Sequence, residues 1–257
     1  MATLELSYYS KALKRYAAVR VILPEIDKKE EGVGSVSTPY KTLYLLHGLG
    51  GNRDSWLRQT NIERYAKAYG IAVVMPEVER SWYADTVYGA KYFTFITQEL
   101  PQVCRSYFKG MSDKREDNFI GGLSMGGYGA LKAALHYPDK YCGCISLSGS
   151  LDITRKGREC EIDLWKGLFG IKESPMELEG TDNDLFALLE RSCTAELPKM
   201  FLWCGTEDVL IRVNCDFAAR LEEKGAEYCF AKSEGDHTWQ YWDKHIVDGL
   251  EYMLGDK

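Results

Sequence analysis

Short apolar runs alternate with stretches of helical spacing along most of the chain. Such runs, when turn signals bound them, are typical of strands buried on both faces, and the stretches between them are typical of amphipathic helices. The apolar runs cover residues 42–46, 71–75, 118–122, 141–147, 199–204 and 227–232, and the helical stretches cover 53–69, 91–108, 125–136, 212–224 and 239–254. This pattern predicts an α/β fold with a mostly parallel sheet and helices on both faces.

Two segments depart from this alternation. Residues 3–24 are rich in β-forming residues and predict two antiparallel strands at the start of the sheet. About fifty residues separate the runs that end at Leu147 and begin at Lys199, which is far longer than a usual connection. We expect this insert, at about 149–198, to form short helices above the strand ends as a partial cap; packing on one edge of the sheet is the alternative. The whole chain, 1–257, is expected to form one domain.

Composition narrows the class of protein. The chain has 257 residues and a formal net charge of -6, which argues against a nucleic-acid partner because such a partner requires a clustered basic face. No secretion signal and no apolar run of membrane-spanning length is visible, so we expect a cytoplasmic protein with no membrane partner. The 8 cysteines are interpreted as free thiols, and no C-x-x-C pair suggests a metal site. The sequence leaves open whether the protein forms a homo-oligomer.

The residues Gly122-Leu-Ser124-Met-Gly126 match the pattern G-x-S-x-G. In the fold that uses this pattern, the serine sits on a sharp, strained turn from a strand to a helix, where side chains at the glycine positions would clash. An apolar run precedes Ser124 and a small-residue helical stretch follows it, as this geometry requires. Ser124 is therefore the candidate nucleophile, and a buried hydroxyl in a glycine-rich turn is the structural alternative.

Elimination among the 4 histidines selects the candidate base. Loops at the carboxyl ends of parallel strands are where such folds place their chemistry, and His237 lies in the loop after the last predicted strand. The others end the first parallel run or lie in predicted helices, at His47, His136 and His245. His237 is therefore the candidate base, and His47 is expected to brace its loop.

The third candidate is the carboxylate that orients the imidazole and stabilises its protonated form. Asp208 lies just after the apolar run 199–204, and it stands between Ser124 and His237 in the order that this fold uses. Glu207 and Asp236 are neighbours that are expected to face elsewhere. The alternative role of Asp208 is to cap the following helix.

The glycine-rich loop after the first parallel run supplies the remaining chemistry. In this fold it gives one backbone N–H to the oxyanion, and the residue after the nucleophile gives another. Leu49 and Met125 are the candidate donors, with Gly50 as the alternative if the loop is shifted. Several aromatic residues are candidates for an apolar acyl or aryl pocket, with core packing as the alternative; they are Trp82, Trp165, Phe169 and Trp239.

Six motifs stand in order along nearly the whole chain: Leu45-Leu-His-Gly-Leu-Gly-Gly, Ser81-Trp-Tyr, Lys91-Tyr-Phe-Thr-Phe, Gly122-Leu-Ser-Met-Gly-Gly-Tyr-Gly-Ala, Trp203-Cys-Gly-Thr-Glu-Asp and Gly235-Asp-His-Thr-Trp. In combination they resemble the Putative esterase family, which includes esterase D and S-formylglutathione hydrolases, tributyrin esterases, feruloyl esterases and mycolyltransferases. Within that family, the motifs look most like those of the tributyrin esterase branch. The resemblance implies an α/β-hydrolase fold and a catalytic triad of Ser124, Asp208 and His237. It also implies that no metal or organic cofactor is needed.

Together, the residues and the resemblance predict a serine esterase whose partner is a small-molecule ester. The family acts on short-chain acyl esters such as acetyl and butyryl esters, including esters of sugars and of aryl alcohols such as feruloyl esters. One alternative is a thioesterase or acyltransferase with the same triad, for example one that hydrolyses S-formylglutathione. A second alternative is a binding module that kept the fold and lost catalysis.

Overall fold

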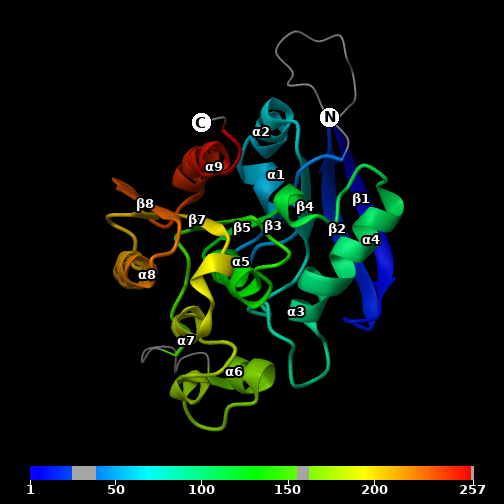
Figure 1. The fold of residues 1–257 in the computed structure, drawn as a ribbon. Helices are drawn as coiled ribbons and strands as arrows, with labels where there is room; N and C mark the ends of the chain where they lie inside the picture. Colours follow the sequence, from blue (N-terminus) through cyan, green and yellow to red (C-terminus); the bar gives the residue numbers. More distant parts are fainter. Residues whose placement is uncertain (25–38, 155–161, 256–257) are drawn as a thin grey trace.

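The computed structural model describes residues 1–24, 39–154 and 162–255. Within them, strands form one sheet in the order β1-β2-β4-β3-β5-β6-β7-β8 (Figure 1). β1, β2 and β4 pair antiparallel, whereas the pairs from β4 across to β8 are parallel. The strands are β1 (Ala2–Ser10), β2 (Arg15–Leu23), β3 (Thr42–Leu46), β4 (Ala72–Pro76), β5 (Asn118–Leu123), β6 (Gly143–Leu147), β7 (Lys199–Gly205) and β8 (Tyr228–Ser233). The predicted mostly parallel sheet with two antiparallel strands at its start is confirmed.

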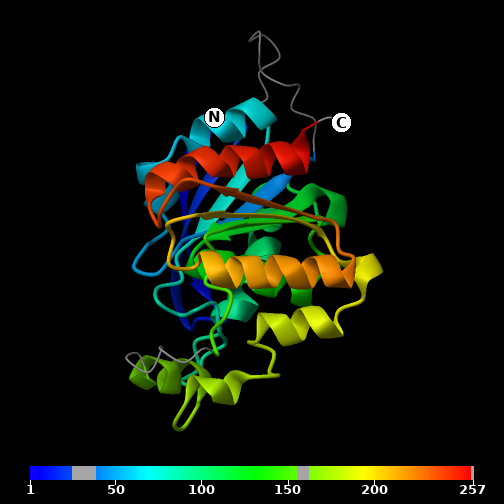
Figure 2. The ribbon, with the colours of Figure 1, turned by 90° about the vertical axis from the view of Figure 1, so that its left-hand side faces the viewer.

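Helices cover both faces of this sheet, as predicted (Figure 2). On one face, α1, α2 and α9 enclose the apolar cluster that contains Trp56 and Trp242; on the other, α4, α5 and α8 enclose the cluster that contains Tyr128 and Phe217. Across the described residues, no helix combines the length and apolar character that a membrane crossing requires. The helices are α1 (Ser55–Gln59), α2 (Ile62–Tyr69), α3 (Tyr92–Thr94), the π-helix η1 (Phe95–Glu99), α4 (Leu100–Tyr107), η2 (Arg115–Asp117), α5 (Met125–His136), α6 (Ile162–Phe169), η4 (Pro175–Leu178), α7 (Leu185–Arg191), η5 (Thr194–Glu196), α8 (Ile211–Lys224) and α9 (Trp239–Leu254).

The helix predicted over 91–108 forms in spite of Pro101. Proline has no N–H, so inside a helix it leaves the carbonyl four residues earlier without a partner. Here the chain passes through the π-helical turn η1 just before Pro101, and the Thr97 carbonyl accepts a hydrogen bond from Lys140 Nζ at 3.1 Å. The lysine therefore supplies the donor that the proline lacks.

The stretch 53–69 was predicted as one helix, but the structure divides it into α1 and α2. Thr60 adopts an extended backbone, and the Asn61 N–H donates to Asp243 Oδ1 of α9 at 2.9 Å. This contact between distant parts of the chain replaces an intrahelical hydrogen bond, which is why helical spacing alone did not reveal the break.

The register of the parallel strands brings their carboxyl ends to one edge of the sheet. Leu46 of β3 lies beside Gly122 of β5, and Leu123 pairs with Leu147 of β6, which in turn pairs with Trp203 of β7. The loops that leave these strands and β8 therefore emerge close together. They carry His47, Leu49, Ser124, Asp208 and His237.

The described part of the insert has two kinds of contact. α7 packs against α5 and α8, and so extends the helix layer on that face, as in the edge-packing alternative. α6 lies farther from the sheet (Figures 1 and 2), and its Trp165 packs on Trp82 with ring centroids 5.2 Å apart. Residues 155–161, which belong to the expected cap, lie outside the described residues.

A buried lysine ties α5 to the turn after β4 and to the insert. Lys132 is 3% exposed, and its Nζ donates to the Tyr83 carbonyl at 3.2 Å and to Asn183 Oδ1 at 2.7 Å. The ammonium also lies 4.6 Å from the centre of the Phe93 ring. Burial lowers the pKa of Lys132 to about 7, although nearby carboxylates oppose this shift. The native structure therefore binds the proton of this amine less tightly than the unfolded chain does.

We expect stability to depend on pH through Lys132. Between about pH 7 and pH 10 the unfolded chain keeps this proton while the native structure loses it, so the penalty for burying the charge fades as the pH rises. Relative to the Lys132→Met variant, the free energy of unfolding of the wild type should increase by about 2 kcal/mol from about pH 7.5 to about pH 9. Urea denaturation of both proteins at both pH values measures this change, and a difference that stays constant with pH would contradict it.

Candidate active site

Ser124 lies on the sharp turn between β5 and α5, with φ 54° and ψ -117°. This backbone conformation is rare for a residue with a side chain and is held by the surrounding packing. A Cβ added to Gly122 would lie 2.6 Å from the Gly126 carbonyl carbon, and a Cβ added to Gly126 would collide with the Leu46 carbonyl oxygen. The glycines of the motif therefore allow α5 to start directly against the ends of β3 and β5.

The structure brings the three predicted triad side chains together from three loops. His237 Nε2 lies 3.0 Å from Ser124 Oγ, and His237 Nδ1 lies 2.9 Å from Asp208 Oδ2. An ionised carboxylate only accepts hydrogen bonds, so Nδ1 is the donor to Asp208 and Nε2 is left to accept from the Ser124 hydroxyl. The imidazole is partly exposed, at 34%, whereas the Asp208 side chain is fully buried.

Hydrogen bonds keep the buried Asp208 charged. Burial by itself raises the pKa of Asp208, but hydrogen bonds from His237, from the Leu210 amide and from the Ser148 hydroxyl outweigh it, so that the pKa lies below its ordinary value. The Leu210 N–H donates to Oδ1 at 2.8 Å. A carboxylate held by several donors stays ionised at neutral pH, as a partner of the imidazolium must.

The two acidic neighbours face elsewhere, as expected. Glu207 Oε2 accepts from the Gly235 N–H at 2.7 Å and so holds the loop that carries His237. Asp236 is exposed and accepts from the Thr238 hydroxyl at 2.6 Å. Asp208 therefore stands as the acidic residue directed at the imidazole, and Glu207 supports the loop from outside.

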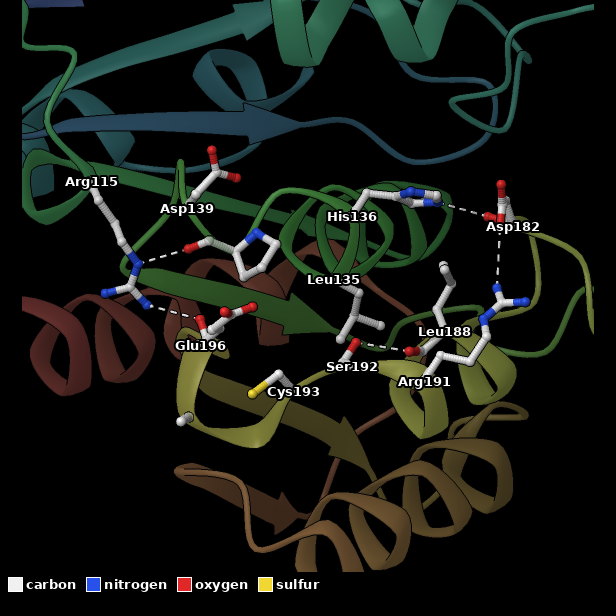
Figure 3. A pocket seen from close by; sticks show the side chains of 12 residues that line it. Arg115, Leu135, His136, Asp139, Asp182, Leu188, Arg191, Ser192, Cys193 and Glu196 are labelled. Atoms are coloured by element: carbon white, nitrogen blue, oxygen red, sulfur yellow. Dashed lines mark hydrogen bonds and ion pairs between the residues drawn. The ribbon is translucent and has the colours of Figure 1, made fainter.

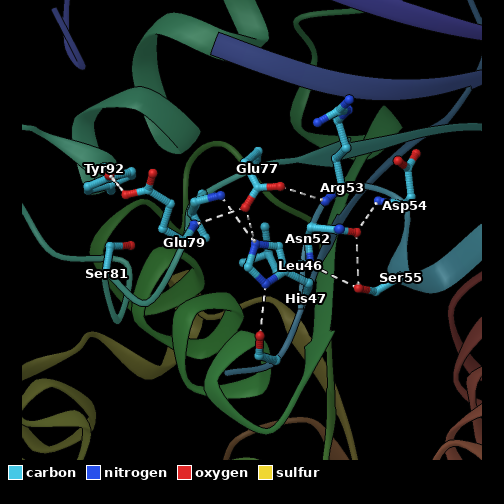
Figure 4. A network of polar contacts seen from close by, with 12 residues as sticks. Leu46, His47, Asn52, Arg53, Asp54, Ser55, Glu77, Glu79, Ser81 and Tyr92 are labelled. Atoms are coloured by element: carbon cyan, nitrogen blue, oxygen red, sulfur yellow. Dashed lines mark hydrogen bonds and ion pairs between the residues drawn. The ribbon is translucent and has the colours of Figure 1, made fainter. Parts of the chain in front are cut away.

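His47 braces the glycine-rich loop through a defined tautomer (Figure 4). Its Nε2 accepts from the Val78 N–H at 3.2 Å, so the ring proton sits on Nδ1, which lies 2.8 Å from the Gly48 carbonyl oxygen. Burial lowers the pKa of His47, although the Gly48 carbonyl and the nearby Glu77 carboxylate oppose this shift. The imidazole is therefore neutral near pH 7, and it donates to the loop.

This brace orients the candidate oxyanion donor. The Gly48 carbonyl accepts from His47 and also from the Gly51 N–H at 3.0 Å. Because C=O and N–H point in opposite directions across a trans peptide, the Leu49 N–H is directed away from His47. Gly48 itself lies against the nucleophile, since a Cβ placed there would be 3.5 Å from Ser124 Cβ.

Met125, the second candidate donor, is the first residue of α5. The first amides of an α-helix have no partner within the helix, and the positive end of the helix dipole lies there. The first intrahelical bond of α5 runs from the Tyr128 N–H to the Ser124 carbonyl. The structure thus leaves the Met125 amide outside the helical ladder, one residue from the candidate nucleophile.

The tryptophans of the expected pocket do not gather around one cavity. Trp82 and Trp165 pack together but are only 2% and 0% exposed. Trp239 belongs to the cluster on the opposite face of the sheet, where it contacts Trp56 and Trp242 at ring-centroid distances of 5.3 and 5.2 Å. The first two therefore lie beneath the site surface, and Trp239 lies on the side of α9.

The sequence analysis missed three residues that support the site. Tyr83 donates its hydroxyl to the His47 carbonyl at 2.8 Å, Trp242 packs edge to face on the His237 ring at 4.9 Å, and Ser148 contacts Asp208. A polar residue directly after a predicted buried strand was a signal available for Ser148. The packing partner of His237 depends on the rotation of α9, which the sequence did not reveal.

A cavity of about 870 Å³ lies at the other end of α5, between that helix and the end of the insert (Figure 3). Two arginines in its lining already have partners within the protein. Arg115 donates to the Pro138 carbonyl at 2.7 Å, and Arg191 pairs with Asp182 at 3.1 Å. His136 Nε2 contacts the Asp182 carbonyl oxygen at 2.9 Å. The candidate catalytic residues therefore lie at the strand ends and not in this cavity. Among the described residues, no group of three or more His, Cys, Asp or Glu side chains is arranged to hold a metal ion.

Comparisons with known proteins agree with this geometry. The chain is 36% identical to an acetyl esterase of Caldicellulosiruptor saccharolyticus over 98% of both chains. Its structure matches the fluorophosphonate-binding serine hydrolase FphF of Staphylococcus aureus with a TM-score of 0.85 and 33% identity, covering 99% of both chains. It also matches the S-formylglutathione hydrolase FrmB of the same organism with a TM-score of 0.81 and 32% identity over 98% of both chains.

These likenesses confirm the predicted α/β-hydrolase fold and the predicted enzyme class, a serine esterase. The Putative esterase profile matches residues 10–253, which is nearly the whole chain. The chain belongs to the Putative esterase family.

Proposed function

We propose that the protein hydrolyses short-chain acyl esters, such as acetyl and butyryl esters, and that Ser124, His237 and Asp208 are its catalytic triad. The observation that carries this proposal is the continuous line of contacts from Ser124 Oγ to His237, at 3.0 Å, and from His237 to Asp208, at 2.9 Å. A nucleophile within hydrogen-bond reach of a base that a third group orients is the arrangement required for acyl transfer.

In the proposed first step, Ser124 Oγ attacks the ester carbonyl carbon while His237 Nε2 takes the hydroxyl proton. The C–O bond to the alcohol then breaks, and His237 returns the proton to the leaving oxygen. In the second step, water gives its proton to His237 and attacks the acyl-enzyme, and Ser124 leaves with that proton. Asp208 stays ionised throughout and stabilises the imidazolium that forms in each step.

The negative oxygen of the tetrahedral intermediate is proposed to lie between the amides of Leu49 and Met125. The orientation of the Gly48–Leu49 peptide and the position of Met125 at the start of α5 support this assignment. Gly50 is the alternative donor.

The acetyl esterase relative and the packing behind the strand-to-helix turn at Ser124 both support a short acyl group. The acetyl esterase relative aligns over nearly the whole chain. Trp82 fills the space beside Tyr128, one helical turn after Ser124, and Trp165 of α6 covers Trp82. We therefore propose that α6 and its neighbours in the insert 149–198 form a partial cap beside the acyl side within a single domain, 1–257. A sugar or aryl alcohol as the leaving group fits an imidazole that is open to solvent.

A thioesterase that acts on S-formylglutathione is the second candidate function, because FrmB covers almost the whole chain at 32% identity. A cytoplasmic location is proposed as well. It is supported by the seven cysteines that the structure describes, all of which are free thiols: Cys104, Cys142, Cys144, Cys193, Cys204, Cys215 and Cys229.

Replacement of Ser124 by alanine tests the nucleophile. The variant loses the attacking oxygen and keeps the fold, so hydrolysis of p-nitrophenyl acetate should fall by at least about 1,000-fold. Steady-state kinetics measure the loss, and a fluorophosphonate probe should label the wild type but not the variant. A folded Ser124→Ala protein with wild-type activity would refute the mechanism.

A substrate panel tests the acyl group and the second candidate function. Trp82 and Trp165 fill the space behind the turn at Ser124. We therefore expect kcat/KM to be highest for acetyl or butyryl p-nitrophenyl esters and to fall by at least about 10-fold for the octanoyl ester. Acetylated sugars, methyl ferulate and S-formylglutathione extend the panel. Faster turnover of octanoyl esters, or of the thioester alone, would contradict short-chain oxygen esters as the substrate class.

Replacement of His47 by alanine tests the oxyanion loop. The variant removes one of the two donors to the Gly48 carbonyl and leaves the Val78 N–H unpaired, so kcat should fall by about 10-fold or more while KM changes little. The matched control is His136→Ala, which also removes an imidazole contact with a main-chain carbonyl but does so far from Ser124. Equal kcat values for the two variants would show that His47 does not orient the loop.

A further inference from the structure

We propose that Ser148 and Trp242 are positioning residues that hold the side chains of Asp208 and His237 in their catalytic positions, an inference that rests on the proposed triad. Both lie outside the residues that contact substrate in the mechanism above. Trp242 Nε1 donates to Ser148 Oγ at 3.1 Å, and the Ser148 hydroxyl lies close enough to the Asp208 carboxylate to lower its pKa. A chain of donors therefore runs from α9 to the acid of the triad.

The direction of this chain follows from the donors available. An indole N–H only donates, so the Ser148 oxygen accepts from Trp242 and its own proton is free for another acceptor. Cys204 Sγ and the Asp208 carboxylate both lie beside this hydroxyl, and the charged carboxylate oxygen is the stronger acceptor. The Asp208 carboxylate also accepts from the Leu210 amide at 2.8 Å and from His237 Nδ1 at 2.9 Å.

The backbone around Ser148 is held from three sides. Ser148 has φ 47°, a left-handed conformation that is uncommon for serine, and its N–H donates to the Trp203 carbonyl of β7 at 2.7 Å. The Gly149 carbonyl accepts from Asn214 Nδ2 of α8 at 2.9 Å, and the Ser150 N–H donates to the Ser124 carbonyl at 3.0 Å. The strained turn is therefore fixed to a strand, to a helix and to the nucleophile itself.

Trp242 acts on the imidazole as well as on the acid. Its ring packs nearly perpendicular to His237, at 88° and 4.9 Å between centroids. The same side chain therefore limits the tilt of the base and, through Ser148, the position of Asp208. Cys204 also lies beside Asp208 and Ser148, and it adds no charge, because burial and the Asp208 carboxylate raise the pKa of its thiol.

A second series of side-chain hydrogen bonds in this protein provides a matched control. Trp203 Nε1 donates to Ser233 Oγ at 3.0 Å, Ser233 lies 3.2 Å from His245 Nε2, and His245 Nδ1 lies 2.6 Å from Asp248. This chain also links an indole, a serine, a histidine and an aspartate, but it ends at α9 and not at the triad. Loss of its serine hydroxyl should cost stability without affecting catalysis.

The experiment compares Ser148→Ala, Trp242→Phe, the double variant and the control Ser233→Ala, with p-nitrophenyl acetate as substrate. Loss of a hydrogen bond to a buried charge predicts that kcat of Ser148→Ala falls by about 10- to 100-fold, with KM changed by less than about 3-fold. Trp242→Phe should lower kcat in the same direction. Phenylalanine keeps an aromatic ring against His237 and removes only the indole N–H, so the double variant should be no slower than Ser148→Ala.

Two further measurements separate positioning from loss of structure. The downfield proton resonance shared by His237 and Asp208 should shift or broaden in Ser148→Ala and stay unchanged in Ser233→Ala. Ser148→Gly removes the same hydroxyl and tolerates the positive φ, so it replaces the alanine variant if that protein does not fold. A folded Ser148 variant with kcat within about 2-fold of the wild type, or kcat losses that multiply in the double variant, would overturn the inference.

The outcome for Ser124→Ala distinguishes this inference from the proposed function. If Ser124→Ala is inactive and the Ser148 variants retain full kcat, the triad stands and the positioning chain fails. If Ser124→Ala keeps its activity, the proposed function itself fails, whatever the Ser148 variants show.

Discussion

The contact between the start of α5 and the end of β3 is the constraint on which the site depends. The Leu46 carbonyl oxygen occupies the space that a side chain at position 126 would fill, so only glycine permits the approach. This approach forces the strained backbone of Ser124 and brings the first amide of α5 beside the loop that starts at His47. The nucleophile, one oxyanion donor and the opposing loop are thus set by a single close packing of main chain against main chain.

Much of this arrangement could be predicted from the sequence because its signals are local. Ser124 lies in a short glycine motif, and His237 and Asp208 each follow a predicted buried strand, in the chain order of the fold. Parallel pairing then brings the ends of these strands together without further information. The succession of strands and helices along the chain was predictable because each element has a local pattern. The register of each strand pair was not, because it depends on contacts between distant residues.

The features that escaped prediction depend on contacts between distant parts of the chain. Helical spacing does not show that Asn61 bonds to Asp243, or that Lys140 serves the carbonyl opposite Pro101. The tryptophans show the same limit: Trp239 and Trp242 lie three residues apart, and only the rotation of α9 decides which of them meets the imidazole. The left-handed backbone that directs Ser148 at Asp208 also has no signature in the residue type.

The elements that carry Ser124 and His237 belong to opposite faces of the sheet. α5 packs in one apolar cluster, whereas α9, which follows the His237 loop, packs in the other (Figure 2). The contact between hydroxyl and imidazole therefore spans the two helical layers at the sheet edge. A molecule with only one of these layers packed on the sheet would lack this contact, so activity requires both layers to be docked.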